Sequence, residues 1–254
     1  MLKTNVNGIK IAYERHGVGT PLVLIHGYPL DHTIWDLLVP LLEPGFDLIL
    51  PDLRGFGESG APTPHYSMDD FTADLIGLLD QLGIQKAAIV GHSMGGYVTL
   101  AFARCHPSRL RGLGLVASQA LPDPPEKKEG RYQEAEHILA HGIRDVAESM
   151  STKLTADTVL QTKLKELMLR QRPDGLAGAL RAMAERQDST LLLPEFDFPV
   201  VLVHGLADKL IPVERARDIG DVVKKGYLIE IEGAGHMPMM EAPQVTADAL
   251  KTLL

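Results

Sequence analysis

The sequence predicts an α/β fold in which a mostly parallel central sheet is flanked by helices and carries an inserted helical cap. Three observations support this prediction. Short apolar runs bounded by glycine or proline recur along the chain, patterns with helical spacing lie between them, and this alternation stops between about residues 119 and 195. We therefore expect a core of residues 1–118 and 196–254 and a cap of residues 119–195.

The predicted strands are short runs of almost continuous apolar residues, the pattern of strands that are covered on both faces of a sheet. These runs span residues 21–27, 46–52, 87–91, 110–117, 200–205 and 227–231. Between two of them, Ser67 can cap a helix whose apolar face continues through Phe71, Leu75, Leu78, Leu79 and Leu82. A strand followed by a helix, repeated along the chain, is typical of a parallel sheet.

The predicted cap has helical spacing and no convincing strand. Its apolar residues form two stripes, one of Ala135, Ile138, Leu139, Ile143, Val146, Ala147 and Met150 and one of Leu160, Leu164, Leu167 and Met168. Helices packed directly on the sheet would show the same stripes. The interruption of the strand series favours a cap.

Charge and composition exclude several classes of function. Lysine and arginine total 25 against 33 acidic residues, a net charge of −8, and no block of like charges could form an arm that binds nucleic acid. No run approaches the roughly 18 apolar residues of a membrane helix. The amino terminus lacks the features of a signal peptide, and Cys105 is the single cysteine. We expect a cytoplasmic protein that binds neither nucleic acid nor membrane.

The strongest functional signal is the segment Gly91-His-Ser-Met-Gly-Gly96, which follows the apolar run 87–90 and precedes a helical pattern. A serine between two glycines at a strand-to-helix junction fits a tight turn that lifts the hydroxyl off the sheet, because any Cβ at the flanking positions would crowd it. An ordinary glycine turn is the alternative, but the strand before it and the helix after it favour Ser93 as a nucleophile.

A serine hydroxyl attacks an ester only when a base takes its proton, and a carboxylate must orient that base. Two further strand ends supply both groups. The run 200–203 leads into His204-Gly-Leu-Ala-Asp208, and the run 227–231 leads into Glu232-Gly-Ala-Gly-His236. The carboxyl ends of parallel strands share one edge of the sheet, where ligands bind in such folds. Ser93, Asp208 and His236 are therefore expected to converge.

The order serine, aspartate, histidine and the motifs around these residues resemble the α/β-hydrolase superfamily, particularly its small cap-bearing esterases and enol-lactonases. The resemblance covers nearly the whole chain. It includes His26-Gly-Tyr-Pro29 after the first long strand and Asp52-Leu-Arg-Gly-Phe-Gly-Glu-Ser59 after the next.

This resemblance implies a role for each residue of the candidate site. Ser93 would be the nucleophile, His236 the general base and then the acid, and Asp208 the carboxylate that orients His236. The backbone N–H groups of Tyr28 and Met94 would form the oxyanion hole that stabilises the tetrahedral intermediate.

Members of the superfamily differ in the position of the acid and in the identity of the nucleophile, and the sequence favours one choice for each. Some members place the acid after the preceding strand, but residues 116–119 hold no carboxylate and the next one is Asp123, so Asp208 is preferred. Relatives that open epoxides or displace halide use an aspartate as nucleophile, whereas this chain has Ser93.

Other motifs are better explained without a ligand. Gly55-Phe-Gly-Glu-Ser-Gly60 matches the dinucleotide fingerprint, but Ala61-Pro-Thr-Pro64 follows it in place of a helix. His137 and His141 have a spacing that can hold zinc, without a third ligand. We interpret His26, His92 and His204 as packed, hydrogen-bonded imidazoles. No cofactor and no metal are expected.

The sequence thus predicts a cofactor-free serine hydrolase that cleaves small-molecule carboxylic esters of short to medium acyl chain through an acyl-enzyme intermediate. An apolar acyl pocket is expected from Met94, Met237, Met239 and Met240, which flank the nucleophile and the base and could equally belong to the core. The alternatives are an enol-lactonase, a perhydrolase, and a ligand receptor of the same fold that does not turn over. The perhydrolase is considered because residues 26–30 resemble those of cofactor-free peroxidases of this fold.

Overall fold

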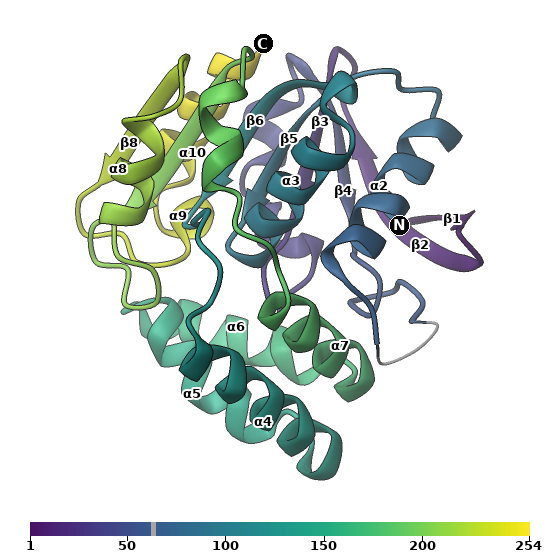
Figure 1. Ribbon diagram of the computed structural model, residues 1–254, viewed down its shortest axis with the longest axis vertical. Coiled ribbons are helices and arrows are strands. Elements are labelled where there is room, and N and C mark those ends of the chain that lie inside the picture. Colours follow the sequence, from purple (N-terminus) through teal and green to yellow (C-terminus); the bar gives the residue numbers. More distant parts are fainter. Residues whose placement is uncertain (62–64) are drawn as a thin grey trace.

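An eight-stranded sheet forms the centre of the structure, a computed structural model that describes residues 1–61 and 65–254. The spatial order is β1-β2-β4-β3-β5-β6-β7-β8, and all neighbours from β4 to β8 are parallel (Figure 1). The strands are β1 (Leu2–Val6), β2 (Ile9–His16), β3 (Thr20–Ile25), β4 (Phe46–Pro51), β5 (Ala87–His92), β6 (Leu110–Val116), β7 (Val200–Gly205) and β8 (Gly226–Ile231). The predicted α/β fold with a mostly parallel sheet is confirmed.

Strands β1 and β2 were not expected from the apolar runs. They form an antiparallel hairpin at one edge of the sheet, where β1 is largely exposed and therefore carries polar residues. Asn7 and Gly8 connect them with φ angles of 50° and 81°. Asn-Gly is the preferred pair for a two-residue hairpin turn with positive φ, so the sequence did contain a signal for this element.

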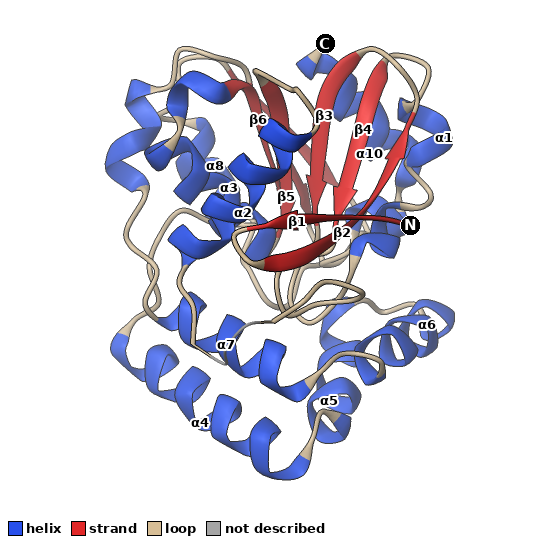
Figure 2. Cartoon of the chain, turned by 90° about the vertical axis from the view of Figure 1, so that its right-hand side faces the viewer, coloured by secondary structure: helices blue, strands red, loops and turns tan. Residues whose placement is uncertain are grey.

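Helices cover both faces of the sheet. Helices α2, α3 and α8 lie on one face, and α1 and α10 lie on the other (Figure 2). Their bounds are α1 (Val39–Leu42), α2 (Met68–Gln81), α3 (Met94–Cys105), α8 (Glu214–Gly220), α9 (Pro238–Glu241) and α10 (Pro243–Leu250). Ser67 caps α2 as predicted, because its hydroxyl accepts from the backbone of Asp70 and the Asp70 carboxylate accepts from the Ser67 amide. No helix among the described residues is long and apolar enough to cross a membrane.

Four helices follow β6 and precede β7 in the sequence. In Figure 1 they lie below the sheet, on the side opposite the carboxyl terminus. They are α4 (Pro125–His141), α5 (Arg144–Leu154), α6 (Thr158–Leu169) and α7 (Pro173–Ala184). We call them the cap helices. The first predicted stripe is divided between α4 and α5, because Gly142 takes a φ of 81° and ends α4. Helix α7 was not predicted, and it packs along α4 (Figure 2).

The cap helices meet the core closely at two glycines. A Cβ on Gly55 would lie 2.7 Å from the Cα of Gly175, at the start of α7, and a Cβ on Gly175 would overlap the Gly55 backbone. Gly55 also has a φ of 83°. Gly55, the first glycine of the segment that matches the dinucleotide fingerprint, therefore serves a tight turn and helix packing, while residues 62–64 after this segment lie outside the described residues.

Candidate active site

Ser93 occupies the turn between β5 and α3 with φ 51° and ψ −113°, an unfavourable backbone conformation for a residue with a side chain. The flanking glycines make this turn possible. A Cβ on Gly91 would overlap the Gly95 carbonyl, and a Cβ on Gly95 would lie 2.6 Å from the carbonyl oxygen of Ile25. The local sequence thus holds Ser93 at the carboxyl end of a central strand, as the motif predicts.

Asp208 and His236 are hydrogen-bonded to each other. Asp208 follows β7, His236 follows β8, and the distance from His236 Nδ1 to Asp208 Oδ2 is 2.7 Å. The other carboxylate oxygen, Oδ1, accepts the backbone N–H groups of Leu210 and Ile211 at 2.8 and 3.0 Å. Because the carboxylate can only accept, His236 carries its proton on Nδ1 and leaves Nε2 free to act as a base.

The surroundings of Asp208 keep it ionised. Its side chain is 1% exposed, and burial alone would raise its pKa. Hydrogen bonds from His204 and His236 outweigh this effect and hold the pKa of Asp208 well below its usual range. The site therefore contains a buried carboxylate that remains charged at neutral pH.

The loop that carries His236 is fixed by Glu241 of α9. The Glu241 carboxylate accepts the backbone N–H groups of Gly235 and Met237, the two neighbours of His236, at 2.9 and 3.0 Å. It also accepts the hydroxyl of Thr155 at 2.6 Å. The N–H group of His236 itself donates to the carbonyl of Leu154, at the end of α5, over 2.9 Å. The position of His236 thus depends on both the core and the cap helices.

His26, His92 and His204 are the three histidines interpreted above as packed imidazoles. All are buried, and their rings are hydrogen-bonded, which agrees with the expectation from the sequence. His92 Nε2 donates to the carbonyl of His236 at 2.8 Å, and the two ring centroids are 4.9 Å apart. His204 Nε2 lies 2.8 Å from the carbonyl of Ile211 and 3.3 Å from Asp208 Oδ2. Sequence reasoning missed that two of these histidines contact the candidate site directly.

Burial affects the charge of His92. Desolvation and the nearby His236 lower the pKa of His92 to about 3. Its ring is therefore neutral at physiological pH. Because Nε2 donates to a carbonyl, Nδ1 carries no proton, and no hydrogen-bond partner for this Nδ1 lies within the described chain.

Two backbone N–H groups are available for an oxyanion hole beside Ser93. Met94 is the first residue of α3, where helix N–H groups lack partners within the helix, and Tyr28 lies in the loop after β3. No acceptor for either N–H group is found among residues 1–61 and 65–254. The phenol of Tyr28 donates to Glu134 of α4 at 3.2 Å.

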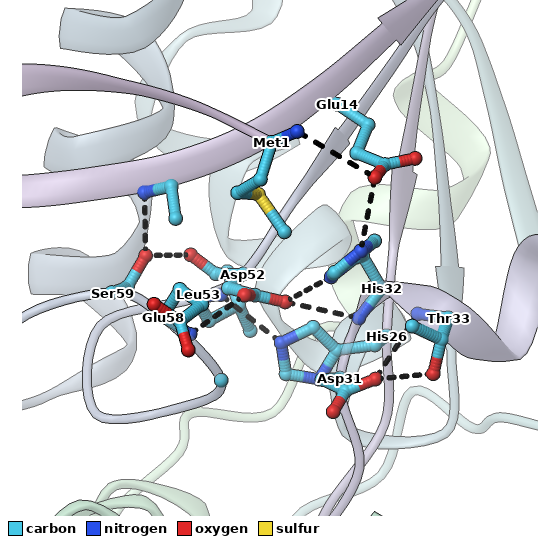
Figure 3. A network of polar contacts seen from close by, with 12 residues as sticks. Met1, Glu14, His26, Asp31, His32, Thr33, Asp52, Leu53, Glu58 and Ser59 are labelled. Carbon is cyan, nitrogen blue, oxygen red and sulfur yellow. Dashed lines mark hydrogen bonds and ion pairs between the residues drawn. The ribbon is translucent and has the colours of Figure 1, made fainter.

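A polar network supports the loop that contains Tyr28 (Figure 3). His26 Nε2 accepts the N–H group of Leu53 at 3.0 Å, while its Nδ1 donates to the Gly27 carbonyl. His32 donates from its ring to Asp52 at 2.6 Å and from its backbone to the same oxygen at 3.1 Å. The loop after β3 is therefore attached to the loop after β4.

Ser93 opens into a cavity of about 160 Å³ between the core and the cap helices. The cavity is lined by Tyr28, Ser93, Tyr97, Lys127, Arg131, Glu134, Met150, Met183, Leu210 and Ile211. Its apolar part includes Met150 of α5 and Met183 of α7. Residues that are distant in the sequence thus form one space beside Ser93.

The expected methionine pocket is wrong in its membership. Met94, Met237, Met239 and Met240 are 0 to 6% exposed and belong to the hydrophobic core, and none lines the cavity beside Ser93. The alternative interpretation of these four side chains, as part of the core, therefore holds. The methionines of the cavity come from the cap helices instead.

Asp123 is paired with two arginines and not with His236. It follows β6 and is hydrogen-bonded to Arg131 and Arg186. His236 pairs with Asp208 instead.

On α4, the rings of His137 and His141 are 4.8 Å apart, and His137 lies 3.4 Å from Asp145. The described residues contain no group of three or more side chains that could hold a metal ion.

The chain matches known proteins over most of its length. Residues 20–243 match the family model described as alpha/beta hydrolase fold. Among solved structures, a thermophilic esterase from Thermogutta terrifontis, with malate bound, is 37% identical, with a TM-score of 0.94 and coverage of 99% of this chain and 96% of that one.

Two curated relatives are named for activities other than ester hydrolysis. Over 234 residues the chain is 33% identical to the dihydrolipoyllysine-residue acetyltransferase component of the acetoin cleaving system of Pseudomonas putida, covering 89% of this chain and 61% of that protein. Over 249 residues it is 28% identical to the non-heme chloroperoxidase CPO-A1 of Kitasatospora aureofaciens, covering 92% of this chain and 90% of that protein. The chain therefore spans less than two thirds of the first of these relatives.

Proposed function

This chain belongs to the α/β hydrolase fold family, and on that basis we propose that it is a carboxylesterase-type serine hydrolase. Its substrates are carboxylic esters of short to medium acyl chain, and its site consists of Ser93, His236 and Asp208. The observation that carries the proposal is the Asp208–His236 hydrogen bond of 2.7 Å at the edge of the sheet where Ser93 occupies a strained turn.

The proposed reaction has two halves. His236 Nε2 accepts the proton of the Ser93 hydroxyl while the oxygen attacks the ester carbonyl, and the Asp208 carboxylate stabilises the imidazolium that forms. The N–H groups of Tyr28 and Met94 donate to the negative oxygen of the tetrahedral intermediate. His236 then protonates the leaving alcohol, and the acyl group remains on Ser93.

Water completes the second half. His236 takes a proton from the water as it attacks the acyl-enzyme, and a second tetrahedral intermediate collapses to release the carboxylic acid. The proton returns from His236 to Ser93. The neutral Nε2 is regenerated with the hydrogen bond to Asp208 kept throughout.

A chromogenic ester such as p-nitrophenyl butyrate tests this proposal. We expect repeated turnover by the wild-type protein, and loss of both turnover and labelling by a fluorophosphonate in Ser93→Ala. Ser149→Ala, on the exposed face of α5, is the matched control and is expected to behave as wild type. Labelling that persists in Ser93→Ala would refute the assignment of the nucleophile.

The same assay separates the alternative functions. A non-turnover receptor would release at most one equivalent of nitrophenol and then stop, whereas an enzyme continues. A lactone and a peracid-forming reaction, tested beside the ester, would identify an enol-lactonase or a perhydrolase. We further propose that residues 119–195 act as a cap that selects substrates and that the enzyme works in the cytoplasm.

A further inference from the structure

Helix α4 presents three charged side chains to the cavity beside Ser93. Lys127, Arg131 and Glu134 are four and three residues apart, a spacing that places them on one face of a helix. The Arg131 side chain is 14% exposed and that of Lys127 is 46% exposed. A purely solvated face would leave Arg131 far more exposed, so this face belongs to the cavity wall.

One buried carboxylate lies behind these cations. Asp123 is 1% exposed and is hydrogen-bonded to Arg131 and Arg186, with the Lys127 ammonium at 3.8 Å. Burial alone would raise the pKa of Asp123, but the hydrogen bonds from Arg186 and Arg131 hold it well below its usual range. The carboxylate is therefore charged and anchors the guanidinium of Arg131.

Arg186 uses its terminal amino groups within the fold. They donate to Asp123 and to the carbonyls of Met183 and Leu121, and its guanidinium carbon lies 4.1 Å from the centre of the Tyr97 ring. Both terminal amino groups therefore donate to acceptors within the protein. Arg186 is thus a structural cation.

Arg131 differs from Arg186 in this respect. Its Nε donates to Asp123, and neither terminal amino group has an acceptor among the described residues. Glu134 accepts the Tyr28 hydroxyl, a neutral partner. Among the residues that line the cavity, Lys127 and Arg131 are the cations and Glu134 is the carboxylate. The cavity lining therefore carries one more positive than negative charge, and the terminal amino groups of Arg131 offer N–H donors to a ligand there.

We propose that the cavity binds esters that also carry a free carboxylate, which is held by Arg131 and Lys127 while Ser93 attacks the ester group. A guanidinium whose terminal amino groups are free is suited to a carboxylate, because it offers parallel N–H donors. The apolar part of the cavity, with Met150 and Met183, accommodates the methylene chain between the two groups. This inference depends on the proposed esterase function, because it identifies the substrate class of the same site.

The test compares two esters that differ in one charge: p-nitrophenyl hydrogen adipate and its methyl ester, p-nitrophenyl methyl adipate. Each rate is corrected for hydrolysis without enzyme. We expect the wild-type kcat/KM to be at least tenfold higher for the anionic ester, as hydrogen bonds to charged groups imply. Addition of about 0.5 M NaCl should reduce this preference, because salt screens the charge of the partly exposed Lys127.

Three variants locate the preference. Arg131→Gln and Lys127→Met are each expected to lower the ratio of anionic to neutral kcat/KM about 10-fold, and Lys127→Glu should lower it further. Lys128→Met is the matched control, because it removes a lysine from the same helix that does not line the cavity. It should keep the wild-type ratio. Lys127→Met also covers the case in which loss of the Arg131–Asp123 bond prevents folding.

The outcomes distinguish this inference from the proposed function. Equal kcat/KM values for the two esters in wild type, with turnover abolished by Ser93→Ala, would overturn the carboxylate preference and leave the esterase proposal intact. An unchanged ratio in both Lys127→Met and Lys127→Glu would also overturn it. If neither ester is turned over by wild-type protein, or if Ser93→Ala retains the activity, both proposals are overturned.

Discussion

Substitution of Asp208 by asparagine tests the proposed chemistry most directly, because all the partners of this side chain are donors. Oδ2 accepts from His236 at 2.7 Å, with His204 at 3.3 Å, and Oδ1 accepts the N–H groups of Leu210 and Ile211. Asparagine offers one acceptor and one donor group at the same place. Whichever way the amide turns, an NH2 group meets an N–H donor.

The structure indicates what this conflict does. With the NH2 group toward His236, the imidazole must move its proton to Nε2, and Nε2 can no longer accept the proton of Ser93. We expect a loss in kcat of about 10³- to 10⁴-fold, equivalent to a barrier increase of roughly 4 to 5.5 kcal/mol. With the NH2 group toward Leu210 and Ile211, unpaired donors would lower the free energy of unfolding by about 1–3 kcal/mol. The first orientation is expected because the His236 proton can move and His204 Nε2 keeps its bond to the Ile211 carbonyl, whereas the N–H groups of Leu210 and Ile211 would lose their acceptor.

The assay is the kcat of p-nitrophenyl butyrate hydrolysis, measured beside the thermal midpoint of each variant. Because the pKa of Asp208 is held below its usual range, titration of Asp208 itself should add no step to the wild-type rate between about pH 6 and 9. Asp74→Asn is the matched control, since Asp74 is 3% exposed and pairs with Arg54 at 2.6 Å, and neither residue lines the cavity beside Ser93. It should lower stability and keep kcat.

A clear result would refute this reasoning. If Asp208→Asn kept more than a tenth of the wild-type kcat while folded, Asp208 would not orient the base. If Asp123→Asn then lost the activity, the acid would have to be assigned to Asp123, after the preceding strand.

Three further predictions concern the surroundings of the site. Glu241→Gln should lower kcat about tenfold at unchanged KM, because one lost acceptor loosens the loop of His236; a change confined to KM would contradict this. Met183→Trp, which narrows the cavity, should lower kcat/KM for p-nitrophenyl hexanoate at least tenfold relative to the acetate, and equal losses would point to general destabilisation. Burial would lower the pKa of His32, but Asp52 raises it, so its contribution to stability is present below about pH 6.5 and lost as the pH rises through the folded-state pKa. The thermal midpoint of His32→Gln should therefore fall further below that of wild type at about pH 5 than at about pH 9. An equal loss in thermal midpoint at both pH values would disprove the charge effect.

The sequence was sufficient for those parts of the fold that depend on burial on both faces. Strands β3 to β7 read as apolar runs because they are largely buried, whereas β1, at an exposed edge, carries polar residues and was missed. Helix α7 was missed for a different reason. Its stripe of Leu176, Leu180 and Met183 has helical spacing, but it is interleaved with Gly175 and Gly178, which weaken a helix prediction and are needed for the close packing against Gly55 and Tyr66.

In the candidate site, too, some features could be predicted from the sequence and others could not. The turn at Ser93 is predictable because only glycine fits beside it, and strand order alone places Asp208 and His236 at the same edge. The roles of His204 and Glu241 depend on how loops fold back onto the site, and no short spacing in the sequence encodes this. The membership of the cavity wall depends likewise on how α4, α5 and α7 dock on the core.

The hydrogen bond from the His236 N–H group to the Leu154 carbonyl joins the end of α5 to the loop that carries the proposed base. Any movement of the cap that carries the end of α5 away from the sheet must break this bond or take the His236 backbone with it. Opening of the cap and alignment of the imidazole are then two readouts of one equilibrium. Substitutions far from the substrate, on the outer surface of α5, would change the chemical step through this linkage, so a slow variant of the cap need not be a binding mutant.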